Sequence, residues 1–371
     1  MEKIKKLILC SIPMSKCNFQ CSYCYLSQRD EAYQGKQAIF KYSPEYVGKA
    51  FSKERLGGSC FFNFCANGET LLTKKIDEYI HAIVSQGHYA EIVTNLSITS
   101  ALDKILSWDQ PLLKRVEFKC SFHYAELMKR NLLQVFADNV QKIWKAGCSA
   151  NIEMVAADEF ISNIDEIKEF SLKNFGALPH VTIARNDATP NIDLLTSLPI
   201  EEYDAIWSTF NSDFWQFKKS IFQEERKEFC YAGKWSLYVN LTTGDTTQCY
   251  CSWFNQNIYK DLKKDIIFNP IGKCLLPHCY NGHALLTSGC IPKFTDIGYG
   301  DIRDRKKNDG SHWLQPEICS YMNSKLEQSN EEIGEKEKTS VYFNSMIGNA
   351  KWQIKEKAKL ISLLIKSKKK I

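Results

Sequence analysis

The first 200 residues alternate short apolar runs with amphipathic stretches. Six runs have the length and the aromatic or β-branched content of buried strands: 7–12, 59–65, 89–95, 115–122, 149–156 and 180–185. Apolar residues follow helical spacing over 74–86, 126–147 and 163–176, stretches that end at Gly87, Gly147 and Gly176. This alternation predicts parallel βαβ units, and about six of them predict an α/β fold with a partial (β/α)6 barrel.

The pattern changes after about residue 200. Residues 200–225 are helical and aromatic-rich, whereas from Phe229 to Pro292 the strands become short and cysteines recur. The sequence "TTGDT" at 242–246 predicts a hairpin turn. The residues after 300 are polar and then basic, and we expect helices there. These changes predict three parts: a barrel over 1–222, a small β-hairpin and helix domain over 223–300, and a helical extension over 301–371.

Cysteine usage indicates metal binding. The chain has 15 cysteines in 371 residues, an odd number in a chain long enough to build a core without disulfides. An intracellular protein with thiolate metal ligands therefore fits better than a secreted disulfide protein, and we expect a cytoplasmic location. The sequence has no run of about 18 apolar residues, so it predicts no membrane-spanning helix.

Three cysteines, Cys17, Cys21 and Cys24, follow the first predicted strand within eight residues. A structural zinc site requires four ligands, usually in two close pairs, and a ferredoxin site requires a fourth thiolate. Three thiolates in one loop suit an iron–sulfur cluster in which one iron stays open to a cofactor or substrate.

With Tyr23, these cysteines form C-x3-C-x-aromatic-C, which resembles the signature of the radical S-adenosylmethionine (radical SAM) superfamily. The resemblance implies a TIM-type partial barrel whose three thiolates hold a [4Fe–4S] cluster, with SAM chelating the fourth iron. It implies that one electron, from a donor such as flavodoxin or ferredoxin, cleaves SAM to a 5′-deoxyadenosyl radical that abstracts hydrogen from the substrate.

Other segments match the family less closely. Asn67, Gly68, Glu69 and Thr70 stand where the family has Gly-Gly-Glu-Pro, which meets the SAM amino group. Asparagine at 67 suits a positive φ, and threonine at 70 predicts a looser turn. Later strand ends supply further candidates for the cavity. They are Asn95, Ser121 and Arg185 for SAM, and His123 and Glu153 for catalysis on the substrate.

A second group of cysteines begins at Cys230. The run from Cys230 to Cys249, with Gly244 between them, resembles the opening of the SPASM and twitch extensions of radical SAM enzymes. The resemblance implies a second, auxiliary [4Fe–4S] cluster, for which we expect the ligands Cys230, Cys249, Cys274 and Cys279. Alternative ligands remain open, namely Cys251, Cys290, His278 and His283, and so does a zinc ribbon in place of the cluster.

The resemblance leaves the substrate open. We expect oxidation or epimerisation of a sugar or glycan-linked substrate, because 16 residues before Cys17 leave no room for an N-terminal peptide-recognition domain. Modification of a ribosomally made peptide is the alternative, and a non-catalytic iron–sulfur protein is another. Epimerisation requires a hydrogen donor, such as Cys65 or Cys120 if either faces the cavity.

The basic charge of the chain is concentrated at its end. Residues 351–371 contain eight lysines and one acid, 8 − 1 = +7, so the remainder of a chain with net charge +5 carries 5 − 7 = −2. Ile354, Ala358, Ile361 and Ile365 follow helical spacing among these lysines. The sequence predicts a basic amphipathic helix that either packs on the barrel or contacts an anionic membrane. The slightly acidic body argues against nucleic acid as a partner.

Overall fold

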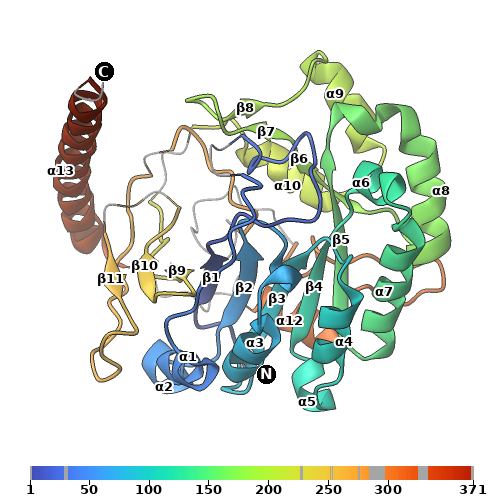
Figure 1. Cartoon of the computed structure of the whole chain (residues 1–371), viewed down its shortest axis with the longest axis horizontal. Helices are drawn as coiled ribbons and strands as arrows, with labels where there is room; N and C mark the ends of the chain where they lie inside the picture. The colour runs from blue at the N-terminus through green and yellow to red at the C-terminus, as the bar shows by residue number, and fades with distance from the viewer. Residues whose placement is uncertain are drawn as a thin grey trace.

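The computed structural model describes residues 2–28, 32–225, 229–250, 252, 254–274, 276–283, 297–324 and 333–368. A nine-stranded sheet with the order β11-β10-β9-β1-β2-β3-β4-β5-β6 forms its centre (Figure 1). The strands are β1 (Leu7–Ile12), β2 (Phe61–Ala66), β3 (Tyr89–Thr94), β4 (Val116–Ser121), β5 (Ser149–Ala156), β6 (His180–Ile183), β9 (Ser236–Asn240), β10 (Asp245–Thr247) and β11 (Gln256–Asn257).

Strands β1 to β6 are parallel neighbours in chain order, which confirms the predicted α/β fold. β11 and β6 lie at opposite ends of the order, so the sheet is not closed into a full barrel. Residues from β1 through β6 and from β9 nevertheless line one cavity, so the sheet curves around it. A small antiparallel pair, β7 (Arg185–Asn186) and β8 (Asp193–Leu194), follows β6.

Helices connect the strands along the outer face of the sheet (Figure 1). Those before β6 are α1 (Pro44–Ala50), α2 (Lys53–Leu56), α3 (Ile76–Val84), α4 (Thr99–Leu106), α5 (Gln110–Leu113), α6 (Tyr124–Lys129), α7 (Leu133–Lys145) and α8 (Ile164–Phe175), with the short 3-10 helices η1 (Thr70–Leu72) and η2 (Asp158–Asn163). The described helices after β6 are α9 (Ile200–Ser208), α10 (Asp213–Ile221), α12 (Pro316–Asn323) and α13 (Glu335–Lys368), and they do not all lie on the outer face.

The predicted helix over 126–147 is wrong in one respect, because two helices, α6 and α7, occupy the region. Asn131 between them has a φ of 54°, a left-handed conformation that ends a helix. The sequence interpretation did not include α1 either. Ser43 caps α1 by accepting a hydrogen bond from the Tyr46 amide, and Pro44 occupies its first turn.

The strands separate two apolar clusters. Ile8, Cys10 and Ile12 of β1 pack in the larger cluster with the outer helices. Leu7 and Leu9 point to the other side and pack with Tyr299, Ile302, Leu314 and Tyr321 of the C-terminal segment. Since successive strand residues face opposite sides, residues 299–322 pack against the inner face of the barrel. Their position on this face was not foreseen from the sequence.

The hairpin predicted at "TTGDT" is present, with β9 and β10 antiparallel and Gly244 at a φ of 78°. Instead of standing apart, β9 pairs in parallel with β1, from Leu7 opposite Ser236 to Ser11 opposite Asn240. The hairpin therefore extends the barrel sheet, and the predicted domain boundaries stay a prediction.

Among the described residues no helix has both the length and the apolar character needed to cross a bilayer.

Candidate functional site

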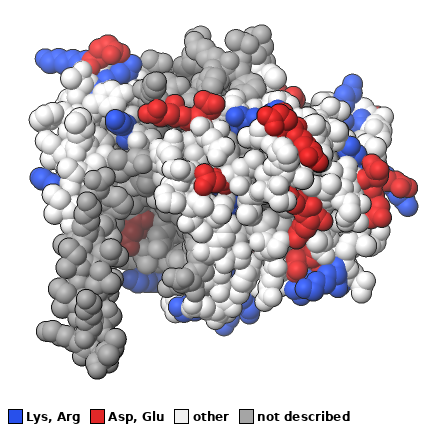
Figure 2. All heavy atoms as spheres, turned by 90° about the horizontal axis from the view of Figure 1, so that it is seen from above, with Lys and Arg blue, Asp and Glu red and all other residues white. Residues whose placement is uncertain are grey.

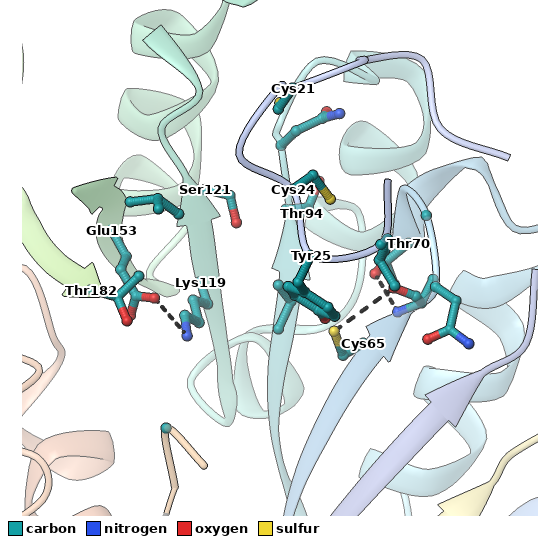
Figure 3. Close-up of a pocket in the computed structure, with 18 of the residues that line it drawn as sticks. Cys21, Cys24, Tyr25, Cys65, Thr70, Thr94, Lys119, Ser121, Glu153 and Thr182 are labelled. Carbon is teal, nitrogen blue, oxygen red and sulfur yellow. Dashed lines mark hydrogen bonds and ion pairs between the residues drawn. The ribbon is translucent and has the colours of Figure 1, made fainter. Parts of the chain in front are cut away.

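A cavity of about 480 Å³ opens at the carboxyl ends of the barrel strands (Figure 3). It is lined by all thirteen residues that the sequence predicted for the catalytic cluster, SAM and the substrate. These are Cys17, Cys21, Tyr23, Cys24, Asn67, Gly68, Glu69, Thr70, Asn95, Ser121, His123, Glu153 and Arg185. The carboxyl ends of parallel strands are where such folds bind ligands, because the loops that carry polar groups converge there.

The three thiols of Cys17, Cys21 and Cys24 lie on one loop above the cavity. Burial, with smaller contributions from neighbouring thiols, raises the pKa of Cys17 to about 11 and that of Cys21 to about 12. A thiol binds metal as a thiolate, so these groups would lose protons on binding iron, and the positive iron would then offset the cost of burying their charge. The donor set fits an iron–sulfur cluster held by one loop.

Tyr23 anchors this loop to β4. Its hydroxyl shares a hydrogen bond of 2.7 Å with Nδ1 of His123, and its ring meets Phe160 edge-on at 5.3 Å. Burial lowers the pKa of His123 to about 4, so the imidazole is neutral at physiological pH. His123, predicted as a substrate-side group, therefore holds the cysteine loop, and a contact with substrate stays a prediction.

The turn after β2 holds the loop from its other side. The Asn67 amide donates to Ile12 O at 3.0 Å, and the Glu69 amide donates to Lys16 O at 3.1 Å. A Cβ on Gly68 would lie 2.2 Å from Lys16 O, so only glycine allows this approach. Asn67 has no positive φ, contrary to expectation. The Thr70 hydroxyl accepts from the Ala66 amide at 3.2 Å and so ties the turn to the end of β2, and the looser turn stays a prediction.

Glu69 connects this turn to β3. One carboxylate oxygen accepts from the Thr94 hydroxyl at 2.6 Å and from the Leu71 amide at 2.9 Å. The other accepts from the Asn95 amide at 2.7 Å. The side chain is only 2 % exposed, and burial raises its pKa despite these donors. Glu69 thus fixes the geometry of the cavity wall as well as lining it.

Two residues that the sequence did not single out complete the connection. Asn18, beside Cys17, accepts from Asn95 Nδ2 at 2.9 Å and donates to Ser97 Oγ at 2.7 Å. The Ser97 hydroxyl also donates to Asn95 Oδ1 at 2.6 Å. The cysteine loop is therefore hydrogen-bonded to the end of β3. An asparagine inside the cysteine motif was the available sequence signal.

Charged groups meet below the cysteine loop, at the inner face of the barrel (Figure 3). Glu153 of β5 pairs with Lys119 of β4 at 3.0 Å and with the fully buried Arg303 at 2.5 Å. Burial opposes ionisation of Glu153, yet the two cations hold its pKa below the ordinary value. Glu153 is therefore a carboxylate, and Ser121 of β4 lines the cavity beyond it.

A second buried pair stands beside the first. His283 Nε2 lies 2.5 Å from a carboxylate oxygen of Glu91, which also accepts from Asn63 Nδ2 at 2.9 Å. Burial raises the pKa of Glu91, but His283 outweighs it, so the net shift is downward. The sequence left His283 open as an alternative ligand of the auxiliary cluster. In the structure its side chain points into the barrel and lines the cavity.

Glu117 lies on the same face of β4 as Lys119 and is completely buried. Neither of its carboxyl oxygens has a hydrogen-bond partner among the described residues. Burial, and then the charge of Glu91, raise its pKa well above the ordinary value. The sequence interpretation did not foresee this ionic interior, because its cation Arg303 and its imidazole His283 arrive from the C-terminal part of the chain.

Arg185 forms part of an aromatic wall of the cavity. Its guanidinium lies over the Tyr25 ring at 4.2 Å and over the Tyr280 ring at 4.4 Å, and its Nε pairs with Asp187 at 2.6 Å. Tyr280 stacks in turn with Tyr250 at 5.8 Å. The wall thus joins the tyrosine after Cys24 to the tyrosines that follow Cys279 and Cys249 in the sequence.

Three of the predicted auxiliary ligands, Cys230, Cys249 and Cys279, pack in apolar clusters of the described residues. Cys230 and Cys249 share a small apolar cluster, and Cys230 forms a β-bridge with Gly272, two residues before Cys274. Cys279 packs against the inner-face cluster. His278 Nε2 lies within hydrogen-bond distance of Asn191 O and Ile192 O, at 3.1 and 3.2 Å. Cys251 and Cys290 lie outside the described residues, and the auxiliary ligand set stays a prediction.

Within the described ranges, no three His, Cys, Asp or Glu side chains are grouped as a single metal ion would require. This finding bears on one-metal sites such as zinc. In a cubane cluster each thiolate binds a different iron, so its ligands do not surround one point.

No protein-family model matches the sequence, and no curated protein matches it. Among solved structures, the chain is similar to Streptococcus suis SuiB bound to S-adenosylmethionine, with 14% identity and a TM-score of 0.44 over 72% of this chain. The match spans 65% of the SuiB chain. The chain is also similar to anSMEcpe with bound AdoMet, with 12% identity and a TM-score of 0.46 over 69% of this chain and 79% of that one. A third similar structure is BtrN in complex with AdoMet and 2-DOIA, with 13% identity and a TM-score of 0.37 over 76% of this chain and 99% of that one.

Proposed function

We propose that this protein is a radical SAM enzyme. The supporting observation is the convergence at one cavity of the three motif cysteines with the turn at 67–70 and the ends of β3 and β4. These segments are separate in the sequence, and Glu69, Asn95 and Asn18 hold them together by hydrogen bonds. Such a connection would place a cofactor bound at the turn beside a cluster bound by the loop.

Cys17, Cys21 and Cys24 would hold the [4Fe–4S] cluster, and the turn at 67–70 with Asn95, Ser121 and Arg185 would hold SAM. When bound, the cluster and SAM supply one-electron cleavage and abstraction of hydrogen from the substrate. The chain itself orients the loop through Tyr23 and His123 and carries fixed charges in the cavity through Lys119 and Glu153. The electron would come from an external donor such as flavodoxin or ferredoxin in the cytoplasm.

An auxiliary [4Fe–4S] cluster in the second group of cysteines is part of the proposal. Cys249 packs against the apolar cluster that contains Cys230, which supports a shared site, and the Cys230 bridge to Gly272 brings Cys274 towards it. Tyr250, next to Cys249, stacks on Tyr280 of the cavity wall. A cluster here would therefore lie next to tyrosines that line the cavity, and we propose that it accepts an electron from the substrate.

The favoured substrate is a sugar or a glycan-linked molecule. Tyrosine rings beside Lys119, Glu153 and Arg185 offer flat apolar surfaces together with charged hydrogen-bonding groups, which suits a ring that carries hydroxyl groups. A ribosomally made peptide is the competing class. Adding a candidate of each class to the reduced enzyme with SAM, and following 5′-deoxyadenosine and substrate mass, distinguishes them.

Oxidation and epimerisation differ in the fate of the substrate hydrogen. Cys65 lines the cavity, whereas Cys120 is fully buried in the outer core, so Cys65 is the better placed hydrogen donor. In deuterated water, epimerisation with Cys65 as donor would add one deuterium to the product, and Cys65→Ser would stop it. A product two hydrogens lighter with no deuterium would instead indicate oxidation.

Iron content and SAM cleavage test the whole proposal on anaerobically reconstituted protein. We expect about eight irons per chain and 5′-deoxyadenosine under a strong reductant, because two cubane clusters hold four irons each. A Cys17/Cys21/Cys24→Ala variant should keep about four irons and cleave no SAM. Cys148→Ala is the matched control, since this thiol is fully buried in the outer core, and it should behave like the wild type.

Each of the other possible results of these iron and SAM measurements would overturn one specific part of the proposed function. About four irons in the wild type and none in the triple variant would remove the auxiliary cluster and leave the catalytic one. A wild type that holds iron but never cleaves SAM would instead support the non-catalytic iron–sulfur alternative.

A further inference from the structure

The last described helix, α13 (Glu335–Lys368), contacts the rest of the protein through side chains of its first half. Ser345 is buried and donates to Ile271 O at 2.8 Å. Val341 lies so close to Gly272 that a Cβ there would be 2.9 Å from it, and Tyr342 meets Phe229 edge-on at 5.3 Å. The first half of the helix is therefore docked beside the second group of cysteines.

The opposite face of α13 is apolar and exposed. Phe343, Met346 and Ile354 are 65 %, 64 % and 69 % exposed, whereas Ile347, at 41 %, lines a groove between α13 and Phe254 and Phe268. At 3.6 residues per turn the first three side chains fall within an arc of roughly 80°. Single exposed apolar residues are ordinary, but a stripe along one helix marks an interaction surface.

The sequence adds positive charge around this stripe. Residues 351–371 contain eight lysines and one acid, and the apolar spacing continues through Ala358, Ile361 and Ile365. On the described part of the face seen in Figure 2, acidic and basic side chains are interspersed instead of gathered by sign. Six of these eight lysines lie within the described range of α13, the helix that carries the exposed stripe.

Position and charge favour one occupant for this surface. Figure 1 shows α13 at the edge of the molecule, on the side of β11 and away from the barrel. Pairing two copies of the helix would place two basic segments side by side, since residues 351–368 of each contain six lysines and one acid, 6 − 1 = +5, and these segments repel each other. An anionic lipid surface instead attracts the lysines while its acyl region accepts the apolar stripe.

We propose that α13 binds the surface of anionic membranes, lying in the plane of the interface with Phe343, Met346 and Ile354 inserted. The proposal does not depend on the radical SAM chemistry, since no residue of the cavity takes part. Together with the proposed function, it would place the enzyme beside a lipid-linked substrate.

Flotation of the full chain with lipid vesicles tests this surface. We expect binding to vesicles of phosphatidylcholine with roughly one-third phosphatidylglycerol, little binding to phosphatidylcholine alone, and loss of binding in high salt. A Phe343→Ser/Met346→Ser/Ile354→Ser variant should bind at least about tenfold more weakly, because three apolar insertions are lost.

The matched control is Ile39→Ser/Ile200→Ser/Ile267→Ser, which removes three exposed apolar side chains elsewhere (79 %, 56 % and 49 % exposed). It should bind vesicles like the wild type, and both variants should keep the helical circular dichroism and the iron content of the wild type. Equal weakening in both variants, or no binding to anionic vesicles, would overturn the proposal. So would a dimer in light scattering that the α13 variant alone dissociates, because it would identify a second copy as the occupant.

Discussion

Individual residues of the cavity hold its walls together in ways that depend on the chemistry of each side chain. Glu69 accepts three hydrogen bonds from two different segments, the turn after β2 and the end of β3. Gly68 contributes the opposite property, the absence of a side chain where two backbones meet. Such positions allow sharp tests, because a change of one or a few atoms separates their structural contribution from that of their neighbours.

Gly68→Ala should disrupt the site from the cysteine loop outwards. The added Cβ would lie 2.2 Å from Lys16 O, a backbone atom that moves only with the loop. We expect a loss of about 1–3 kcal/mol in the free energy of unfolding and poor iron retention. Gly334→Ala is the control, since nothing lies within 4 Å of its Cβ position. Urea denaturation and iron assays measure both effects, and a Gly68→Ala protein equal to the control would refute the close approach.

Glu117 and Glu153 should respond oppositely to replacement by glutamine. Glu117 has a raised pKa, so the unfolded chain loses this proton at lower pH than the folded protein, and stability falls as pH rises above about 4.5. Glu117→Gln removes this loss, and the variant should gain stability relative to the wild type between pH 5 and pH 8.

Glu153→Gln should destabilise the protein at neutral pH by about 3–5 kcal/mol, because it leaves Lys119 and the buried Arg303 without their carboxylate. Urea denaturation at the two pH values measures both variants. An equal loss of stability in both would mean that Glu117 is ionised in the folded protein.

At the scale of elements, the cysteine loop is held by hydrogen bonds to β3 and β4, and its cysteines follow the end of β1. Tyr23 contacts His123 at the end of β4, and Asn18 contacts Asn95 and Ser97 after β3. The loop is therefore oriented by strands that are distant in sequence. A cluster bound by this loop would therefore be held in a fixed position relative to β3 and β4.

Asn18→Ala should loosen this loop without removing a thiol. It breaks two side-chain hydrogen bonds, and we expect a loss of about 1–2 kcal/mol together with faster release of iron to a chelator. Asn163→Ala, which breaks an exposed hydrogen bond to Glu166, should change neither quantity measurably. Iron release as slow as in the wild type would show that the asparagine does not hold the loop.

The whole molecule should lose stability in acid through its buried imidazoles. His88 is fully buried; its Nδ1 accepts from the Cys60 amide at 3.1 Å and its Nε2 lies 2.6 Å from Phe51 O. Burial lowers its pKa to about 4, whereas an unfolded histidine titrates near 6.5. The unfolded chain therefore takes up the proton first, and stability is lost as pH falls from about 6.5 to about 4.

His88→Gln should make this acid slope shallower, by up to about 3 kcal/mol over that range. Urea denaturation at pH 7 and pH 5 measures the slope. His123 and His180 also have lowered pKa values, so part of the slope should remain in the variant. A slope identical to that of the wild type would mean that His88 titrates normally.

The sequence anticipated features that local spacing encodes. The predicted bounds of β1 and β5 agree with the structure at every residue. Both are continuous apolar runs bounded by polar residues, a pattern that indicates a buried strand. The split between α6 and α7 was missed, since asparagine in a left-handed conformation leaves only a weak signal in a helical pattern. Lys119, Glu91 and Asn18 were also missed as site residues, because one polar residue in a strand or loop does not reveal its partner.

The sequence by itself determined the parallel strand–helix order and the group of three cysteines, since both depend on residues close together in the chain. Only the tertiary structure decided which charges share the cavity. Arg303 meets Glu153 across 150 positions, and His283 meets Glu91 across 192. These pairs form because the C-terminal segment packs against the inner face of the barrel. Local periodicity predicts helices and strands, but it does not predict which distant segments will pack together.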